Sequence, residues 1–221
     1  MGRTHFDQDY YEFFIGLTLN NHKQWFDENR GTYTKEIKPM FEDFVNALIS
    51  EMQKVSSDFN GINAKDCMFR INRDIRFSKD KTPYKTFFSA SIHQNGRKAM
   101  NPGGMYLEIG PENCAIYSGV YMPEKELLQK IRSNIYHNLE EFNQIINNKK
   151  FKNVFGEIRG EKNKRIEKEF MEVAEKQPLI LNKQFYIFHK FEPEDTMKPE
   201  FLNTLIEVWK LTKDFNDFLK R

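Results

Sequence analysis

The 221-residue chain has the composition of a folded globular protein, with 39% hydrophobic residues and 21 phenylalanines, so we expect a core rich in aromatic rings. Its net charge of +2 is too mild for a general nucleic-acid binder, and no apolar run is long enough for a membrane-spanning helix. Acidic side chains near the N-terminus exclude a signal peptide, and Cys67 and Cys114 provide no disulfide framework, so we expect a cytoplasmic protein with both thiols unpaired.

The N-terminal third has the apolar spacing of helices. Residues 7–18 predict one helix, and Asn21 followed by Gln24 has the pattern of a capping box that opens a second one. Residues 33–55 predict a long helix on the same grounds. Within it, Pro39 is expected to cause a kink or a break just before that residue, because proline cannot donate the helical hydrogen bond.

The middle third changes to the alternation that is typical of strands. Residues 86–94 alternate and lead into an Asn95–Gly96 turn. Residues 105–109 and 116–120 flank residues 110–113, which contain glycine and proline, and this arrangement predicts a hairpin.

The C-terminal part predicts further helices and one strand. Pro123 is placed for the first turn of a helix, residues 164–175 have a helical and strongly charged pattern, and Pro199 opens a long closing helix. A strand is expected at residues 185–191. Together these elements predict a single domain over residues 1–221 with an α+β fold, in which helices from the N- and C-terminal thirds pack on a central antiparallel sheet.

Residues 69–85, called the basic segment below, concentrate the positive charge of the chain. Six cations and two anions give this segment a charge of +4, so the rest of the chain sums to −2. A compact positive region in an otherwise slightly acidic protein is a candidate anion-binding surface. Its charged residues are Arg70, Arg73, Asp74, Arg76, Lys79, Asp80, Lys81 and Lys85.

Extended backbone is the better interpretation of residues 69–77, because a helix would scatter their apolar side chains. A strand would place Phe69, Ile71, Ile75 and Phe77 on one face and Arg70, Asn72, Asp74 and Arg76 on the other. Arg73 is a cation on the apolar face. We therefore expect it to be buried against a carboxylate, or re-aimed by a bulge in the strand.

Strand geometry leaves three interpretations of the positive charge open. Arg70 and Arg76 would lie about 20 Å apart at roughly 3.3 Å per residue, so one phosphate could contact both only if the chain bends between them. The segment therefore binds an elongated anion, folds back around a compact one, or pairs its cations with internal acids as a purely structural feature. Exposed pairs of that last kind contribute only about 0–1 kcal/mol each.

The motif Phe-Arg-x-x-Arg-Asp-x-Arg-Phe-Ser-Lys-Asp-Lys-x-Pro-Tyr-Lys at residues 69–85 resembles the signature of the family catalogued as domain of unknown function 2461. The likeness covers nearly the whole chain, although Glu167 stands where such proteins often have proline. It implies that the basic segment is the defining feature of the family, and it supplies no activity. Further matching positions are Asn20–Asn21, Trp25–Phe26, Asn29–Arg30, Tyr33, Gly104, Tyr106, Ile109, Gly119, Tyr121, Pro123, Ile131–Arg132, Lys164–Arg165, Lys183 and Phe185.

The sequence thus predicts a protein that binds an anionic, phosphate-bearing small molecule. Arginines would make two-point contacts to phosphate oxygens and lysines would supply point charge, while Asp74 and Asp80 would orient the arginines or serve as a base. The candidate ligand-binding residues are Asn29, Arg30, Arg70, Arg73, Asp74, Arg76, Lys79, Asp80, Lys81, Tyr84 and Lys85.

The alternative is a nucleic-acid-binding or protein-interaction module that uses the same surface. The five histidines lack the spacing of a metal site, and no phosphate-binding or dinucleotide motif is present, so neither a metal nor a cofactor is expected. The reaction, if there is one, and the oligomeric state are left open by the sequence.

Overall fold

The computed structural model describes residues 3–99 and 101–221. The chain forms two compact units. Unit 1 comprises Met1–Arg97, Tyr106–Ile116 and Lys190–Ile206, and unit 2 comprises Lys98–Met105, Tyr117–His189 and Glu207–Arg221.

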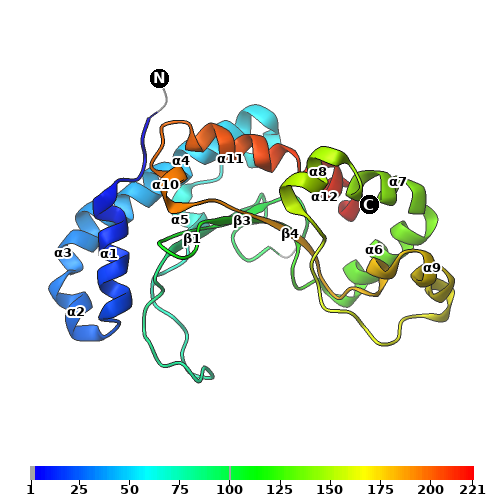
Figure 1. Ribbon diagram of the computed structural model, residues 1–221, viewed down its shortest axis with the longest axis horizontal. Coiled ribbons are helices and arrows are strands. Elements are labelled where there is room, and N and C mark those ends of the chain that lie inside the picture. Colours follow the sequence, from blue (N-terminus) through cyan, green and yellow to red (C-terminus); the bar gives the residue numbers. More distant parts are fainter. Residues whose placement is uncertain (1–2, 100) are drawn as a thin grey trace. The chain divides into compact units, whose positions relative to one another are not determined.

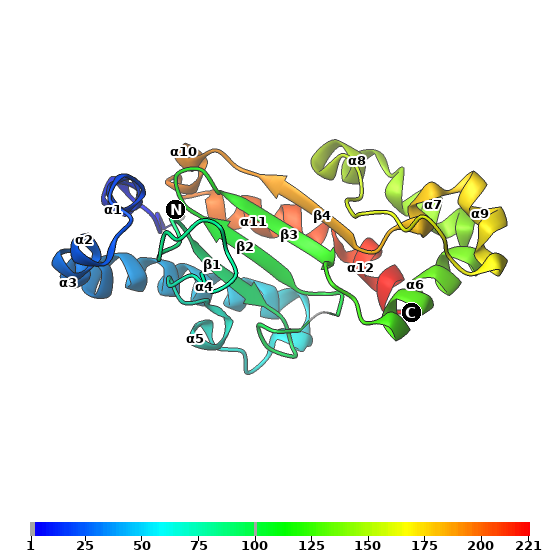
Figure 2. The ribbon, with the colours of Figure 1, turned by 90° about the horizontal axis from the view of Figure 1, so that it is seen from below.

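Four strands form an antiparallel sheet in the order β1-β2-β3-β4 (Figure 1 and Figure 2). They are β1 (Phe88–Ile92), β2 (Met105–Ile109), β3 (Ala115–Val120) and β4 (Phe185–Lys190). In the turn between β2 and β3, the Asn113 N–H donates to the Gly110 carbonyl at 3.3 Å. The predicted α+β fold and the hairpin are therefore confirmed, as are the strands predicted at 86–94, 105–109, 116–120 and 185–191.

Helices make up most of the remaining regular structure (Figure 1). Unit 1 contains α1 (Gln8–Leu19), α2 (Lys23–Glu28), α3 (Arg30–Thr32), a π-helical turn at Tyr33–Ile37, α4 (Lys38–Val55), α5 (Ala64–Cys67), α10 (Pro193–Thr196) and the first part of α11 (Phe201–Lys210). Unit 2 contains α6 (Lys125–His137), α7 (Leu139–Ile146), α8 (Lys149–Phe155), α9 (Met171–Lys176) and α12 (Lys213–Lys220). Short 3-10 turns lie at Ser57–Phe59, Lys168–Phe170 and Pro178–Leu181.

The N-terminal helices follow their sequence signals with two exceptions. The carboxylate of Asp7 caps α1 by accepting the Tyr10 N–H at 3.1 Å. The sequence predicts a kink or a break just before Pro39, but the structure shows no break there: a π-helical turn ends at Ile37 and continues directly into α4, with helical backbone at Ile37 and Lys38. The predicted cap of α2 is wrong, since His22 Nδ1 accepts the Trp25 N–H and Asn21 lies one residue earlier.

Three other predictions need correction. Pro123 precedes α6, whose N-cap is Glu124. Residues 164–167 are not helical, because the backbone just before them pairs with residues 181–183 instead, where the Asn163 N–H donates to the Leu181 carbonyl at 2.8 Å. The closing helix is two helices, because the Thr212 hydroxyl donates to the Trp209 carbonyl at 2.7 Å where α11 ends.

Aromatic rings hold the core of unit 1 together. Phe88 of β1 lies 5.5 Å from Phe14 of α1 and 5.0 Å from Phe41 of α4, measured between ring centroids. Phe44 of α4 stacks on Phe201 of α11 at 5.5 Å. The N-terminal helices α1 and α4 therefore pack on the first strand through phenylalanines, and α11 from the C-terminal part packs on α4 in the same way.

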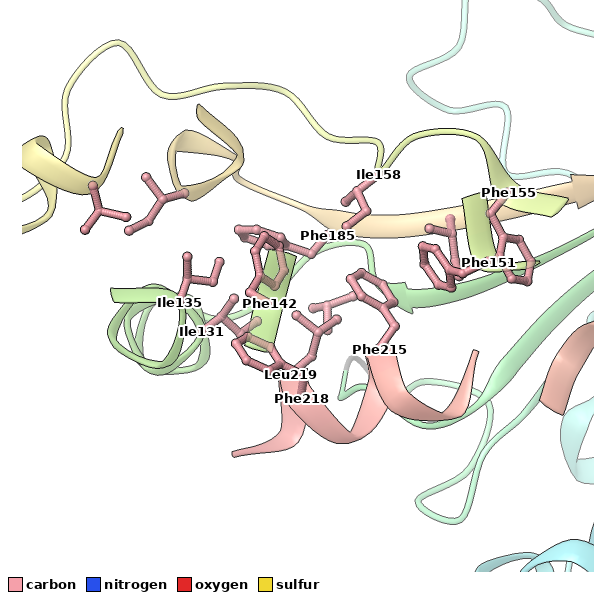
Figure 3. Close-up of a cluster of buried hydrophobic side chains, with 14 of the residues drawn as sticks. Ile131, Ile135, Phe142, Phe151, Phe155, Ile158, Phe185, Phe215, Phe218 and Leu219 are labelled. Carbon is pink, nitrogen blue, oxygen red and sulfur yellow. The ribbon is translucent and has the colours of Figure 1, made fainter. Parts of the chain in front are cut away.

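Unit 2 has its own buried cluster (Figure 3). Ile131 and Ile135 of α6, Phe142 of α7 and Phe185 of β4 meet the rings of α12, where Phe218 lies 5.2 Å from Phe142. This core makes one face of β3 and β4 apolar and covered.

Candidate functional site

The basic segment folds back on itself in unit 1. Asn72 and Tyr84 form an antiparallel bridge, and the Arg73 N–H donates to the Pro83 carbonyl at 2.9 Å. Residues 73–83, called the basic loop below, are thereby closed at their base. The predicted strand at 69–77 is wrong, because the chain bends at Ile71 and again at residues 76–77, and within this range the structure forms an isolated bridge at Asn72 in place of a strand.

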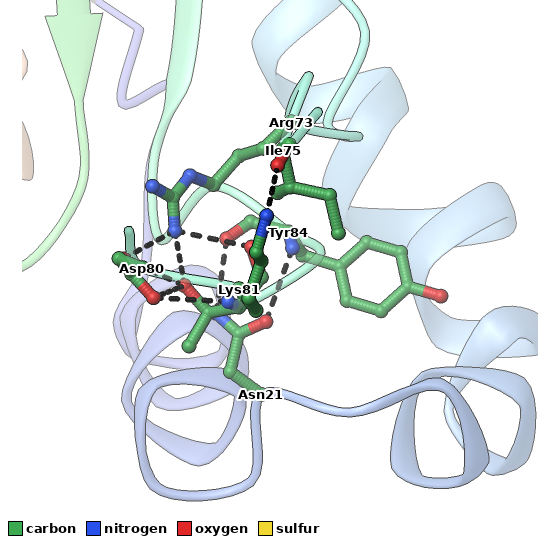
Figure 4. A network of polar contacts seen from close by, with 7 residues as sticks. Asn21, Arg73, Ile75, Asp80, Lys81 and Tyr84 are labelled. Carbon is green, nitrogen blue, oxygen red and sulfur yellow. Dashed lines mark hydrogen bonds and ion pairs between the residues drawn. The ribbon is translucent and has the colours of Figure 1, made fainter. Parts of the chain in front are cut away.

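Asn21 fixes the closing end of the loop. Its amide nitrogen donates to the Tyr84 carbonyl at 2.9 Å, and its amide oxygen accepts the Tyr84 N–H at 3.1 Å. The Tyr84 ring points away from the polar network (Figure 4) and stacks on Phe26 at 4.2 Å. Tyr84 is therefore an anchor of the loop, and Asn21 is a structural residue whose role sequence reasoning missed.

A second network spans the interior of the basic loop (Figure 4). Arg73 donates to the Asp80 carboxylate at 2.5 Å, to the Thr82 carbonyl at 3.0 Å and to the Thr82 hydroxyl. The Thr82 N–H and then the Arg73 guanidinium lower the pKa of Asp80 to about 2. Lys81 donates to the Ile75 carbonyl at 2.9 Å. Arg73 thus lies against a carboxylate, as the first of the two expected alternatives had it, but the pair is not buried, since the two side chains are 26% and 58% exposed.

Asp74 and Arg76 form a second, exposed pair. The guanidinium makes two contacts with the carboxylate, at 2.9 and 2.7 Å, and lowers the pKa of Asp74 to about 2. Carboxylates with such low pKa values are weak bases near neutral pH. The geometry therefore favours an orienting role for Asp74 and Asp80.

Arg70, Lys79 and Lys85 form no ion pair with a carboxylate of the described residues. Arg70 and Lys79 are exposed and make no hydrogen bond or ion pair with the residues that the structure describes. Lys85 is half-buried, with its Nζ 3.2 Å from Ser89 Oγ and 5.1 Å from the centre of the Phe69 ring. Burial, opposed by Glu108 and reinforced by the charge of Arg70, lowers the pKa of Lys85.

Asn29 and Arg30 have local partners. Asn29 donates its side-chain amide to the Trp25 carbonyl at 2.9 Å, and Arg30 pairs with Asp27. The Arg30 guanidinium also lies 5.3 Å from the centre of the Phe26 ring, which in turn stacks on the Tyr84 ring. Arg30 is thus linked to the basic segment through Phe26, whereas the contact of Asn29 is to Trp25.

Phe77 differs most from its expected position. We expected it on an apolar face, but its side chain is 95% exposed, with the Arg76 guanidinium 5.8 Å from its ring centre. The alternation predicted for residues 69–77 ends before Phe77, because the chain turns where the Ser78 N–H donates to the Ile75 carbonyl at 3.3 Å. A large exposed ring in a charged loop is a candidate contact residue. The assignment of residues 69–77 to two faces of a strand did not identify it.

The described part of the chain shows no group of three or more His, Cys, Asp or Glu side chains arranged to hold a metal ion. None of its helices combines the length and apolar character that crossing a membrane requires.

Comparison with known proteins identifies one family. The pattern of the family described as "Conserved hypothetical protein (DUF2461)" matches residues 9–218, a span that contains the entire basic segment. No curated protein matches the chain, and no solved structure does.

Proposed function

The chain belongs to the DUF2461 family, and we propose that it binds a phosphate-bearing anionic small molecule at the basic segment. The observation that carries this proposal is the division among its cations. Arg73 and Arg76 form ion pairs with the two carboxylates of the segment, whereas Arg70, Lys79, Lys81 and Lys85 form no ion pair with the described residues. Uncompensated positive charge beside a braced loop favours an anionic partner.

The contacts inside the loop would prepare this site for its ligand. Arg73, Asp80 and Asn21 hold the loop in one conformation before a ligand arrives, which reduces the entropy lost on binding. Arg70 can contact two phosphate oxygens at once, and Lys79 supplies a mobile point charge. Lys85 is partly removed from water, where charge interactions are stronger. A cytoplasmic location is part of this proposal, because the buried thiols of Cys67 and Cys114 are free.

One observation favours a second candidate, which is a nucleic-acid or protein partner on the same surface. Phe77 is almost fully exposed, and aromatic rings beside cations are common contact residues for macromolecules. The two candidates differ in salt response, because a duplex loses about 0.9 log units of affinity per log unit of salt for each phosphate neutralised. A small ligand would show a much shallower dependence.

Calorimetric titration with inorganic pyrophosphate, a nucleoside triphosphate and a short duplex tests the proposal at two salt concentrations. We expect the small phosphates to bind with a shallow salt dependence, and Lys79→Ala to weaken them by about 1.5–3 kcal/mol, the range for a hydrogen bond to a charged group. Lys65→Ala removes another exposed lysine of unit 1 and serves as the matched control. Equal effects of the two substitutions would refute a site at the basic segment, and a steep salt dependence with the duplex would favour the second candidate.

A further inference from the structure

Four aromatic side chains form two ring pairs in unit 2, from β3, from the residue just after it and from β4, and we call them the aromatic face. Tyr117 stacks on Phe188 with ring centroids 5.6 Å apart, and Tyr121 meets Tyr186 edge to face at 5.4 Å. Tyr121 is 62% exposed, and the other three rings are half-buried. Two neighbouring ring pairs thus present aromatic surface to solvent.

These rings are not part of the core of unit 2. The alternate residues Val120, Phe185 and Ile187 are buried among the side chains of the hydrophobic cluster, including Phe215 of α12. Figure 2 looks onto β3 and β4 with no helix drawn over them. Large aromatic side chains at uncovered positions are not explained by core packing, and exposed apolar surface of this kind marks interaction sites.

Positive charge borders the aromatic face. Residues 159–163 run beside residues 181–186, and the Arg159 N–H donates to the Tyr186 carbonyl of β4 at 2.7 Å. The Arg159 guanidinium lies 5.2 Å from the centre of the Phe188 ring and 3.2 Å from the Glu157 carboxylate. Lys162, Lys164 and Arg165 are exposed or half-exposed and form no ion pair with the described residues. Unit 2 contains 18 Lys and Arg against 13 Asp and Glu, a net charge of +5.

We propose that the aromatic face binds single-stranded nucleic acid, with bases stacked on Tyr121 and its neighbours and phosphates along residues 159–165. Exposed rings combined with a cationic track are the two components of sequence-tolerant single-strand binding. The bases must be unpaired, because in a duplex their flat faces are already stacked on each other. The positive border argues against a neutral sugar as the occupant. This inference concerns unit 2 and does not depend on the ligand of the basic segment.

Fluorescence anisotropy of labelled oligothymidylate and oligouridylate with the full chain tests this proposal. Tyr121→Ala should weaken binding by roughly ten-fold or more, as expected for the loss of one stacked base, while Tyr121→Phe keeps the ring and should keep the affinity. Lys164→Ala should weaken all sequences alike and reduce the salt slope by about 0.7, the value for one phosphate of a single strand. A duplex of the same sequence should bind more weakly than the single strands.

Two control variants distinguish the aromatic face from the rest of the protein surface. Tyr136→Ala removes a 39% exposed ring from α6 of the same unit, and it should leave the affinity unchanged. Lys65→Ala removes an exposed lysine of unit 1, outside both proposed surfaces, and should also have no effect. The proposal is overturned if the wild-type chain does not bind single strands, or if Tyr136→Ala and Tyr121→Ala act equally. It is also overturned if light scattering shows a dimer that Tyr121→Ala dissociates, because a second copy would then occupy the face.

Discussion

Replacing Gly119 with alanine is expected to lower the free energy of unfolding by at least about 3 kcal/mol, through backbone strain and overpacking together. Gly119 lies in β3 with φ of +106°, which L side chains rarely adopt. A Cβ at this position would lie 2.2 Å from the Phe185 carbonyl oxygen and 3.0 Å from the Tyr186 Cα. Both atoms belong to the backbone of β4, so the strand pair itself must shift to make room. Chemical denaturation measures the effect.

Gly156→Ala is the matched control, because it separates strain from overlap. Gly156 also has positive φ, at +69°, but a Cβ there would meet no atom within 4 Å. This substitution should cost only the conformational strain, about 1–3 kcal/mol. If Gly119→Ala and Gly156→Ala have the same free energy of unfolding, β3 and β4 do not approach each other as closely at Gly119 as described.

Replacing Phe142 with alanine is expected to lower the free energy of unfolding by about 3–5 kcal/mol, the usual cost of removing a buried aromatic ring. The Phe142 side chain is fully buried and lies between α6 and α12, next to Phe218 (Figure 3). The cavity that it leaves cannot close, because helices on both sides would have to move together. The midpoint and slope of urea unfolding report the change.

Phe77→Ala makes the same chemical change at an exposed position. Since the Phe77 side chain is 95% exposed, its removal should change the stability by no more than about 0.5 kcal/mol. A large loss of stability at Phe77 would show that its ring is buried in the folded protein. It would also restore the apolar strand face that the sequence pattern predicted.

The sequence predicts the elements of this fold well where one periodicity dominates. The alternation over residues 86–94 and the glycine and proline at 110–111 predict β1 and the hairpin, because local rules decide both. The helix predicted at residues 164–167 is wrong for the opposite reason. Their charged pattern suits a helix, but the adjacent backbone, at Asn163, pairs with Leu181, and sequence alone does not reveal such tertiary pairing.

The charge pattern of the sequence located the candidate site. It could not predict which of the cations pair with carboxylates and which do not. A cluster of six cations is visible in the sequence, yet which of them meet Asp74 and Asp80 depends on how the loop folds back. Asn21 clamps Tyr84 from more than sixty residues away in the chain, so the pattern around it indicated only a helix cap. The exposed position of Phe77 likewise depends on a turn at Ile75 that interrupts the alternation.

A paired comparison of Arg70→Ala and Arg73→Ala tests the central claim, that the cations of the basic segment divide into ligand contacts and loop supports. Both variants are titrated with inorganic pyrophosphate in the calorimeter, and their melting temperatures are recorded. Arg70 makes no hydrogen bond or ion pair with the described residues, so its removal should weaken binding by about 1.5–3 kcal/mol and leave the melting temperature unchanged. Arg73 contacts Asp80 and Thr82, so its removal should lower the melting temperature. If Arg70→Ala instead destabilises the fold and leaves pyrophosphate binding intact, the basic segment is a structural feature and the proposed division is wrong.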